Sequence, residues 1–156
     1  DRFVYVVDCS GSMSGPPFRK ACNELLGSVG RLKGAQSFYV FFFSSQSYPM
    51  FFPSPPAPEM VKANRENYRR LAQWVGGFSQ SGGTEPTAAL LSALELRPDV
   101  IYLLSDGQFP DTVVDRVRQA NEHRTVIHTV GFQNQIGEGQ LRRIAEENQG
   151  NYRFVP

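Results

Sequence analysis

The sequence has few cysteines and no long apolar run. Its 156 residues include two cysteines, Cys9 and Cys22. Their spacing matches neither a paired-CxxC zinc site nor a disulfide framework, so we expect both thiols to be reduced. The longest apolar run, 38–43, has the length of a strand and is far below the ~20 residues of a membrane-spanning helix. We therefore expect a globular domain with no membrane span within these residues.

The sequence also lacks a charge excess of either sign. Lys and Arg number 16 against 15 Asp and Glu, so the formal net charge is +1. Such a balance gives no field that would attract nucleic acid or an anionic membrane, and we expect no nucleic-acid partner. Nucleotide-binding motifs (GxGxxG after a strand, GxxxxGK[ST]) and the GxSxG of serine hydrolases are absent as well. Any binding or catalytic function must therefore depend on a local site.

The length, 156 residues, is close to the usual size of one domain. We predict a single domain over 1–156, with a monomer as the default state. No signal peptide precedes the first predicted strand, so we expect a domain excised from a longer protein. Short loops and the absence of disulfides suggest a bacterial origin.

Strand-like and helix-like segments alternate along the chain, which predicts an α/β fold with a mainly parallel sheet. The predicted strands are nearly continuous in apolarity, as in strands covered on both faces. They are 3–7, 37–43, 100–104, 125–131 and 152–155, with a sixth, 48–52, expected as an antiparallel edge strand after a short polar turn. Helical spacing of apolar residues predicts helices over 17–32, 58–75, 86–96, 112–122 and 138–148.

Three polar clusters follow predicted strands or flank them: DCSGS at 8–12, SGGTEP at 81–86 and SDG at 105–107. In an open parallel sheet such loops share one edge, and ligands bind there where the strand order reverses. The oxygen donors brought together would be Asp8, Ser10, Ser12, Thr84 and Asp106. Hard oxygen ligands suit divalent cations other than zinc, and the many hydroxyls favour Mg²⁺ or Mn²⁺ over Ca²⁺.

Asp8, Ser10 and Ser12 in the pattern DxSxS, with GGT at Thr84 and LLSDG at Asp106, resemble the metal-ion-dependent adhesion site (MIDAS) of von Willebrand factor type A (vWA) domains. The resemblance extends over essentially the whole chain. It implies a Rossmann-like three-layer α/β/α fold whose central six-stranded sheet is mostly parallel, with one antiparallel edge strand. It also implies a divalent metal whose coordination is completed by an Asp or Glu carboxylate from a protein partner.

The resemblance further assigns roles within the site. Ser10 and Ser12 would bind the metal directly, and Thr84 directly or through water. Asp8 and Asp106 would bind directly or through waters and hold the hydroxyls in place. The helix that follows the last strand in ligand-switching members, and moves on binding there, has no counterpart after 152–155 in this sequence, so regulation by such a movement stays an open question here.

Three functions stay open at this point. The first is a metal-dependent protein-binding module for adhesion, and the second a Mg²⁺-dependent phosphoryl-transfer or hydrolytic enzyme of Rossmann-like fold. In the enzyme, Ser10 stands where that chemistry would need a second carboxylate, so we expect no catalysis. The third is a scaffold that the metal only stiffens. Localisation is open, with an extracytoplasmic or cell-surface position favoured over the cytoplasm.

Several residues near the predicted site have simpler expected roles. Asp111 is expected to cap the helix at 112, and Glu85 to be a solvated glutamate in the first turn of its helix. His128 is expected to be a hydrogen-bonded histidine within the sheet. Phe109 follows SDGQ, where an exposed aromatic side chain could contact a partner. Trp74 and the aromatic residues of 38–43 are expected in the core.

Overall fold

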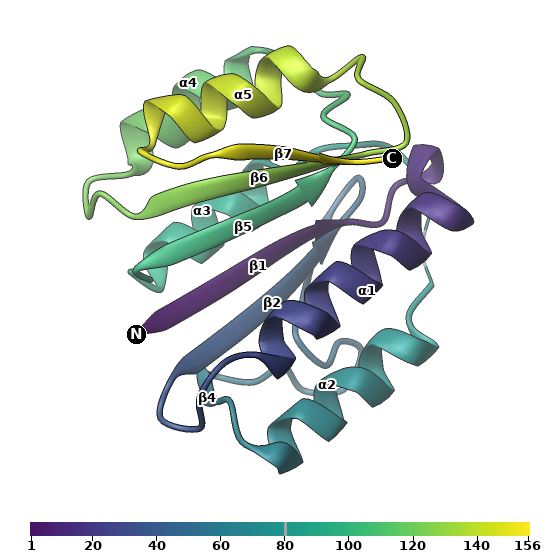
Figure 1. Ribbon diagram of the computed structural model, residues 1–156, viewed down its shortest axis with the longest axis vertical. Helices are drawn as coiled ribbons and strands as arrows, with labels where there is room; N and C mark the ends of the chain where they lie inside the picture. The colour runs from purple at the N-terminus through teal and green to yellow at the C-terminus, as the bar shows by residue number, and fades with distance from the viewer. Residues whose placement is uncertain (80) are drawn as a thin grey trace.

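A seven-stranded sheet runs through the middle of the molecule in the computed structural model, which describes residues 1–79 and 81–156. The path of neighbouring strands is β3-β2-β1-β5-β6-β7, and β4 also pairs with β2 (Figure 1). The strands are β1 (Arg2–Asp8), β2 (Ser37–Phe43), β3 (Ser47–Pro49), β4 (Val61–Lys62), β5 (Val100–Ser105), β6 (Val126–Phe132) and β7 (Tyr152–Val155).

The sheet is mostly parallel. β1 pairs in parallel with β2 and β5, and β6 pairs in parallel with β5 and β7. The short strands β3 and β4 both run antiparallel to β2. The chain moves outward from β1 to β2 on one side and from β5 to β6 and β7 on the other, so the strand order reverses between β1 and β5. The predicted fold class is confirmed, and this reversal marks where a ligand site is expected.

Helices cover both faces of the sheet, which makes the three layers visible in Figure 1. α1 and α2 pack together on one face, and α3, α4 and α5 form a continuous layer on the other. Their bounds are α1 (Pro16–Gly30), α2 (Arg65–Gly77), α3 (Thr87–Glu95), α4 (Thr112–Ala120) and α5 (Glu138–Glu147), with a 3₁₀ turn at Gly11–Met13 before α1. Burial on both faces explains why the central strands are nearly all apolar.

Two predicted elements differ from the structure near β2. The helix expected over 58–75 begins only at Arg65, because the Asn64 side chain caps it by accepting a hydrogen bond from the backbone N–H of Asn67 at 2.9 Å. The residues before the cap are extended and include β4. The edge strand expected over 48–52 ends at Pro49, and the chain then turns, with φ of 80° at Phe51.

The core follows the sequence prediction closely. The aromatic side chains of β2 are buried, and Trp74 is partly buried against them. Both cysteines are free thiols, as expected, with Cys9 buried and Cys22 partly exposed. His128 also has its predicted role, since its Nδ1 accepts a hydrogen bond from the backbone N–H of Asn151 at 3.0 Å. Its ring lies against that of Tyr102, with centroids 5.2 Å apart.

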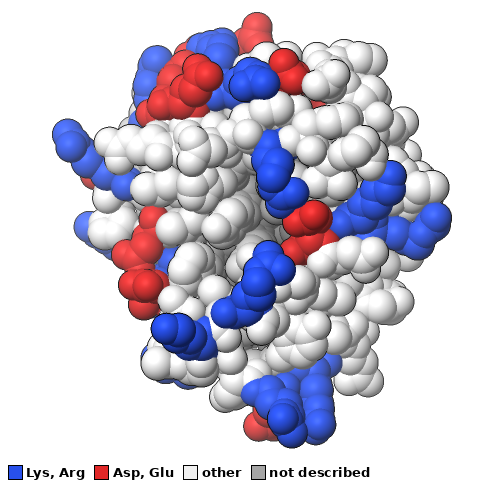
Figure 2. Space-filling model, in the orientation of Figure 1, with Lys and Arg blue, Asp and Glu red and all other residues white. Residues whose placement is uncertain are grey.

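Basic and acidic side chains are interspersed on the face shown in Figure 2, with a broad uncharged area between them. No continuous field of one sign covers that face, which agrees with the near-zero net charge of +1. Each helix in the described part of the chain is too short or too polar to cross a bilayer.

Candidate metal centre

The two carboxylates of the predicted site lie at the strand reversal. Asp8 is the last residue of β1, and Asp106 directly follows β5. The two strands are paired in parallel with Val7 opposite Leu104, so Asp8 and Ser105 reach the same sheet edge. Residues nearly one hundred positions apart in the sequence are thereby brought together.

Asp8 is fully buried, and both of its carboxylate oxygens accept hydrogen bonds from the two loops. Oδ1 accepts from the backbone N–H of Ser10 at 2.8 Å, and Oδ2 accepts from the hydroxyl of Ser105 at 2.7 Å. The Ser105 oxygen in turn accepts from the backbone N–H of Gly107 at 3.0 Å. Asp8 therefore fastens the loop after β1 to the loop after β5.

A chain of oxygen atoms joins the remaining donors. The Ser12 hydroxyl donates to Asp106 Oδ2 at 2.5 Å, and the Oγ atoms of Ser10 and Ser12 are 3.1 Å apart. Because Ser12 gives its only proton to Asp106, Ser10 must donate to Ser12. Asp106 Oδ1 is held by the backbone N–H of Gln108 at 3.2 Å. Three donor side chains from two loops thus lie in contact.

Thr84 lies on the third loop, which touches the first through its backbone. The N–H of Gly11 donates to the carbonyl of Gly82 at 3.0 Å, and the N–H of Glu85 donates to the carbonyl of Ser44 at 2.8 Å. Thr84, between these two contacts, is half-buried. Among the described residues its side chain forms no hydrogen bond with the other four donors. The structure therefore brings four predicted donors together and places Thr84 on the adjoining loop.

The turn after β5 requires glycine at Gly107, whose φ is 76°. A Cβ added there would lie 2.5 Å from the carbonyl oxygen of Gly137, at the start of α5. This close approach packs the loop between β6 and α5 against the backbone of Asp106 and Gly107, which holds the backbone that carries the Asp106 carboxylate.

Within the described residues, neither Asp8 nor Asp106 forms an ion pair, although both are buried. Burial raises the pKa of Asp8; hydrogen bonds from Ser10 and Ser105 oppose that shift, and the negative charge of Asp106 adds to it. Two adjacent buried carboxylates that no basic side chain of the described residues pairs with, next to two serine hydroxyls, match the chemistry of a small divalent ion. The described residues contain no cluster of three His, Cys, Asp or Glu, so such a site depends on hydroxyls.

Sequence reasoning missed Ser105, which links Asp8 to the β5 loop. A hydroxyl directly before Asp106, at the end of a buried strand, was the available signal. Two neighbouring predictions were wrong. Phe109 is only 6% exposed, and the side chain of Asp111, at the start of α4, forms no capping hydrogen bond. Glu85 is exposed, as expected, but it precedes α3 and accepts a hydrogen bond from the N–H of Thr87, the first residue of that helix, at 2.9 Å.

The motif, the strand reversal and the convergence of Asp8, Ser10, Ser12 and Asp106 are those expected of a vWA domain. A family model of the von Willebrand factor type A domain matches residues 1–154. The chain belongs to this family.

Relatives agree with that assignment. Inter-alpha-trypsin inhibitor heavy chain H4 from Homo sapiens is 26% identical over 171 aligned residues, covering 97% of this chain and 18% of that protein. A von Willebrand factor A domain-containing protein from Dictyostelium discoideum is 25% identical over 162 residues, covering 98% of this chain and 16% of that protein. The chain thus spans less than a fifth of these curated relatives.

A solved structure has the same fold. The von Willebrand factor type A structure from Catenulispora acidiphila superposes with a TM-score of 0.88 at 20% identity, over 100% of this chain and 38% of that chain. The sequence relatives named above are eukaryotic and this structural relative is bacterial, so bacterial origin stays a prediction.

Proposed function

We propose that this vWA domain is a protein-binding module with a divalent cation, Mg²⁺ or Mn²⁺, at its MIDAS. The ion would be held by Asp8, Ser10, Ser12, Thr84 and Asp106, and its coordination would be completed by an Asp or Glu carboxylate of a partner. The observation that carries the proposal is the contact between Ser10, Ser12 and Asp106 beside buried Asp8. A bound cation supplies positive charge and an open coordination position for the partner's carboxylate.

The proposed donors would have different roles in the site. Asp8 uses both oxygens to hold backbone and hydroxyl donors, so its main task is to position the two loops and to contribute negative charge. Ser10 and Ser12 present their oxygens side by side, and Asp106 lies next to Ser12. Ser12 is exposed whereas Ser10 and the carboxylates are buried, so the site opens to solvent on the Ser12 side. This opening favours a partner ligand over a purely structural ion.

The same geometry gives little support to catalysis. No Lys, Arg or His among the described residues hydrogen-bonds or pairs with the five donors. The nearest thiol, Cys9, is buried and donates to the carbonyl of Phe43, and burial raises its pKa to about 12, which disfavours the thiolate needed for a nucleophile. The absence of enzymatic activity, like the location at the cell surface or outside the cytoplasm, remains a prediction.

The proposal is tested by nuclear magnetic resonance with a minimal carboxylate probe. N-acetyl-aspartate amide is titrated into isotope-labelled protein in Mg²⁺ and, separately, in chelator. We expect the amide signals of Gly11, Ser12 and Gly107 to shift with the probe only in Mg²⁺. The matched probe N-acetyl-asparagine amide, which lacks the charge, should cause no such shifts. Equal shifts with both probes, or shifts that persist in chelator, would refute metal-dependent recognition of a carboxylate.

A further inference from the structure

A small hollow shares a wall with the candidate metal centre. It has a volume of about 180 Å³ and is lined by Phe18 and Phe78, with Ser10, Ser14 and Ser79 among the other lining residues. We call it the Phe18–Phe78 hollow. Ser10 belongs both to this hollow and to the set of proposed metal donors, so the hollow adjoins the candidate metal centre.

The two aromatic side chains of the hollow are fixed from behind. Phe18, on α1, and Phe78, directly after α2, both pack on buried Phe42, with ring centroids 5.7 and 4.4 Å away. Phe78 also contacts Trp74 and Tyr48 edge-on, at 5.3 and 5.5 Å. Both rings are nevertheless partly exposed. A rigid aromatic surface that stays partly open binds an apolar side chain with little cost in ordering.

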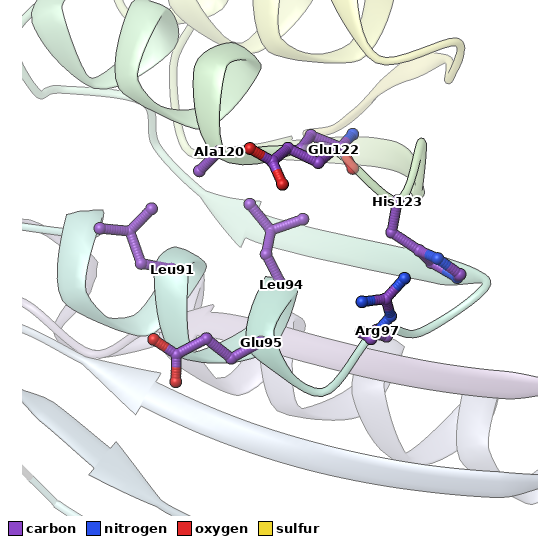
Figure 3. A pocket seen from close by; sticks show the side chains of 8 residues that line it. Leu91, Leu94, Glu95, Arg97, Ala120, Glu122 and His123 are labelled. Atoms are coloured by element: carbon purple, nitrogen blue, oxygen red, sulfur yellow. The ribbon is translucent and has the colours of Figure 1, made fainter.

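The charge of its lining distinguishes this hollow from others on the surface. Among the described residues, no Lys, Arg, Asp, Glu or His lines the Phe18–Phe78 hollow. By contrast, the hollow in Figure 3 lies between the ends of α3 and α4, and its lining includes Glu95, Arg97, Glu122 and His123. That hollow is at the opposite sheet edge, where β5 and β6 begin. The hollow beside the metal centre is thus suited to an uncharged occupant.

A second apolar side chain lies in the loop that packs against the backbone of Asp106. Ile136 is 77% exposed, in the loop between β6 and α5. Its neighbour Gly137 is the residue that packs against the backbone of Asp106 and Gly107. In Figure 1 this loop and the start of α1 lie at the same end of the sheet. An isoleucine exposed to this degree adds little to the core and is accessible to a partner held at the metal centre.

We propose that the partner segment has a large apolar side chain next to its acidic residue, and that this side chain enters the Phe18–Phe78 hollow while Ile136 contacts the opposite flank. This inference rests on the proposed function, because the acidic residue must first be held at the metal. It narrows the partner from any acidic protein to an exposed segment with an Asp or Glu between apolar residues.

The test compares two peptides in Mg²⁺, acetyl-Gly-Asp-Gly-amide and acetyl-Phe-Asp-Phe-amide. We expect the second to bind about tenfold more tightly, which corresponds to about 1.4 kcal/mol. Ser79→Trp, which fills the hollow, should remove most of this advantage, whereas Ser54→Trp, at an exposed serine elsewhere, should leave it intact. Ile136→Ser should weaken only the Phe-containing peptide, by about threefold, and should leave the fold intact because Ile136 is 77% exposed.

Each outcome bears on one proposal or on both. If acetyl-Gly-Asp-Gly-amide binds in Mg²⁺ but the Phe-containing peptide gains nothing, the hollow is not a binding pocket, and the metal proposal stands. A gain that survives both Ser79→Trp and Ile136→Ser also overturns the assignment of the hollow. If neither peptide binds in Mg²⁺, the proposed function and this inference both fail.

Discussion

Replacing Ser105 by Ala tests whether the hydrogen bonds around Asp8 hold the site together. In the chelated protein the change leaves Asp8 Oδ2 and the backbone N–H of Gly107 without the partners they have at 2.7 and 3.0 Å. All three residues are buried, so water does not replace the lost hydroxyl freely. An unsatisfied buried group costs about 1–3 kcal/mol, and for two groups with partial relaxation we expect a loss of about 2–4 kcal/mol.

Urea denaturation of the chelated protein measures this loss. For a domain of this size it corresponds to a fall in Tm of roughly 4–16 °C. A loosened Asp8 should also weaken Mg²⁺ binding by about 10–100-fold, although Ser105 is not a proposed ligand. Ser54→Ala, at an exposed serine, is the matched control and should change the free energy of unfolding by less than about 0.5 kcal/mol. A Ser105→Ala protein as stable as the wild type, with unchanged Mg²⁺ affinity, would refute this account of Asp8.

Three further predictions concern single side chains. Burial lowers the pKa of His128, so the unfolded chain takes up the proton first, and stability should fall as pH drops below about 6.5. In His128→Phe, urea denaturation at pH 7.5 and 5.5 should show a smaller difference; an unchanged difference would contradict this. Arg153 pairs with Glu24 at 2.8 Å but is exposed, so Arg153→Ala should cost at most about 1 kcal/mol, and a cost that persists in 1 M salt would exclude the ion pair as its cause. Gly107→Ala should cost at least about 1–2 kcal/mol in thermal unfolding, because φ is 76°, and a neutral effect would be inconsistent with the close approach of Gly137.

The fold could be predicted because its main strands are buried on both faces. Such strands leave an unmistakable apolar run in the sequence, and 37–43 was located to the residue. β4 was missed because a strand of two residues has no periodicity, and its pairing with β2 depends on tertiary contacts. The true start of α2 was signalled by Asn64, a good capping residue, but the apolar residues before it matched helical spacing and extended the predicted helix.

The sequence also allowed the prediction that the residues at the carboxyl ends of β1 and β5 lie close together. Parallel pairing carries Asp8 and Asp106 to one edge, and the DxSxS loop follows directly. The side-chain position of Thr84 could not be predicted, because it depends on how the loop at 81–86 packs on Gly11 and Ser44. The prediction that Phe109 is exposed was wrong for a similar reason. Its N–H donates to the carbonyl of Gly107 at 2.9 Å, and this tight turn accompanies burial of the ring.

The central claim is that the chain binds one divalent cation at the Asp8–Asp106 edge. Calorimetric titration of Mg²⁺ and Mn²⁺ into chelator-treated protein tests it most directly, with Asp106→Ala and the exposed control Asp99→Ala in parallel. We predict binding of one ion per chain in the wild type and in Asp99→Ala, and none in Asp106→Ala. Binding of equal strength in Asp106→Ala, or no binding of either ion by the wild type, would contradict the account.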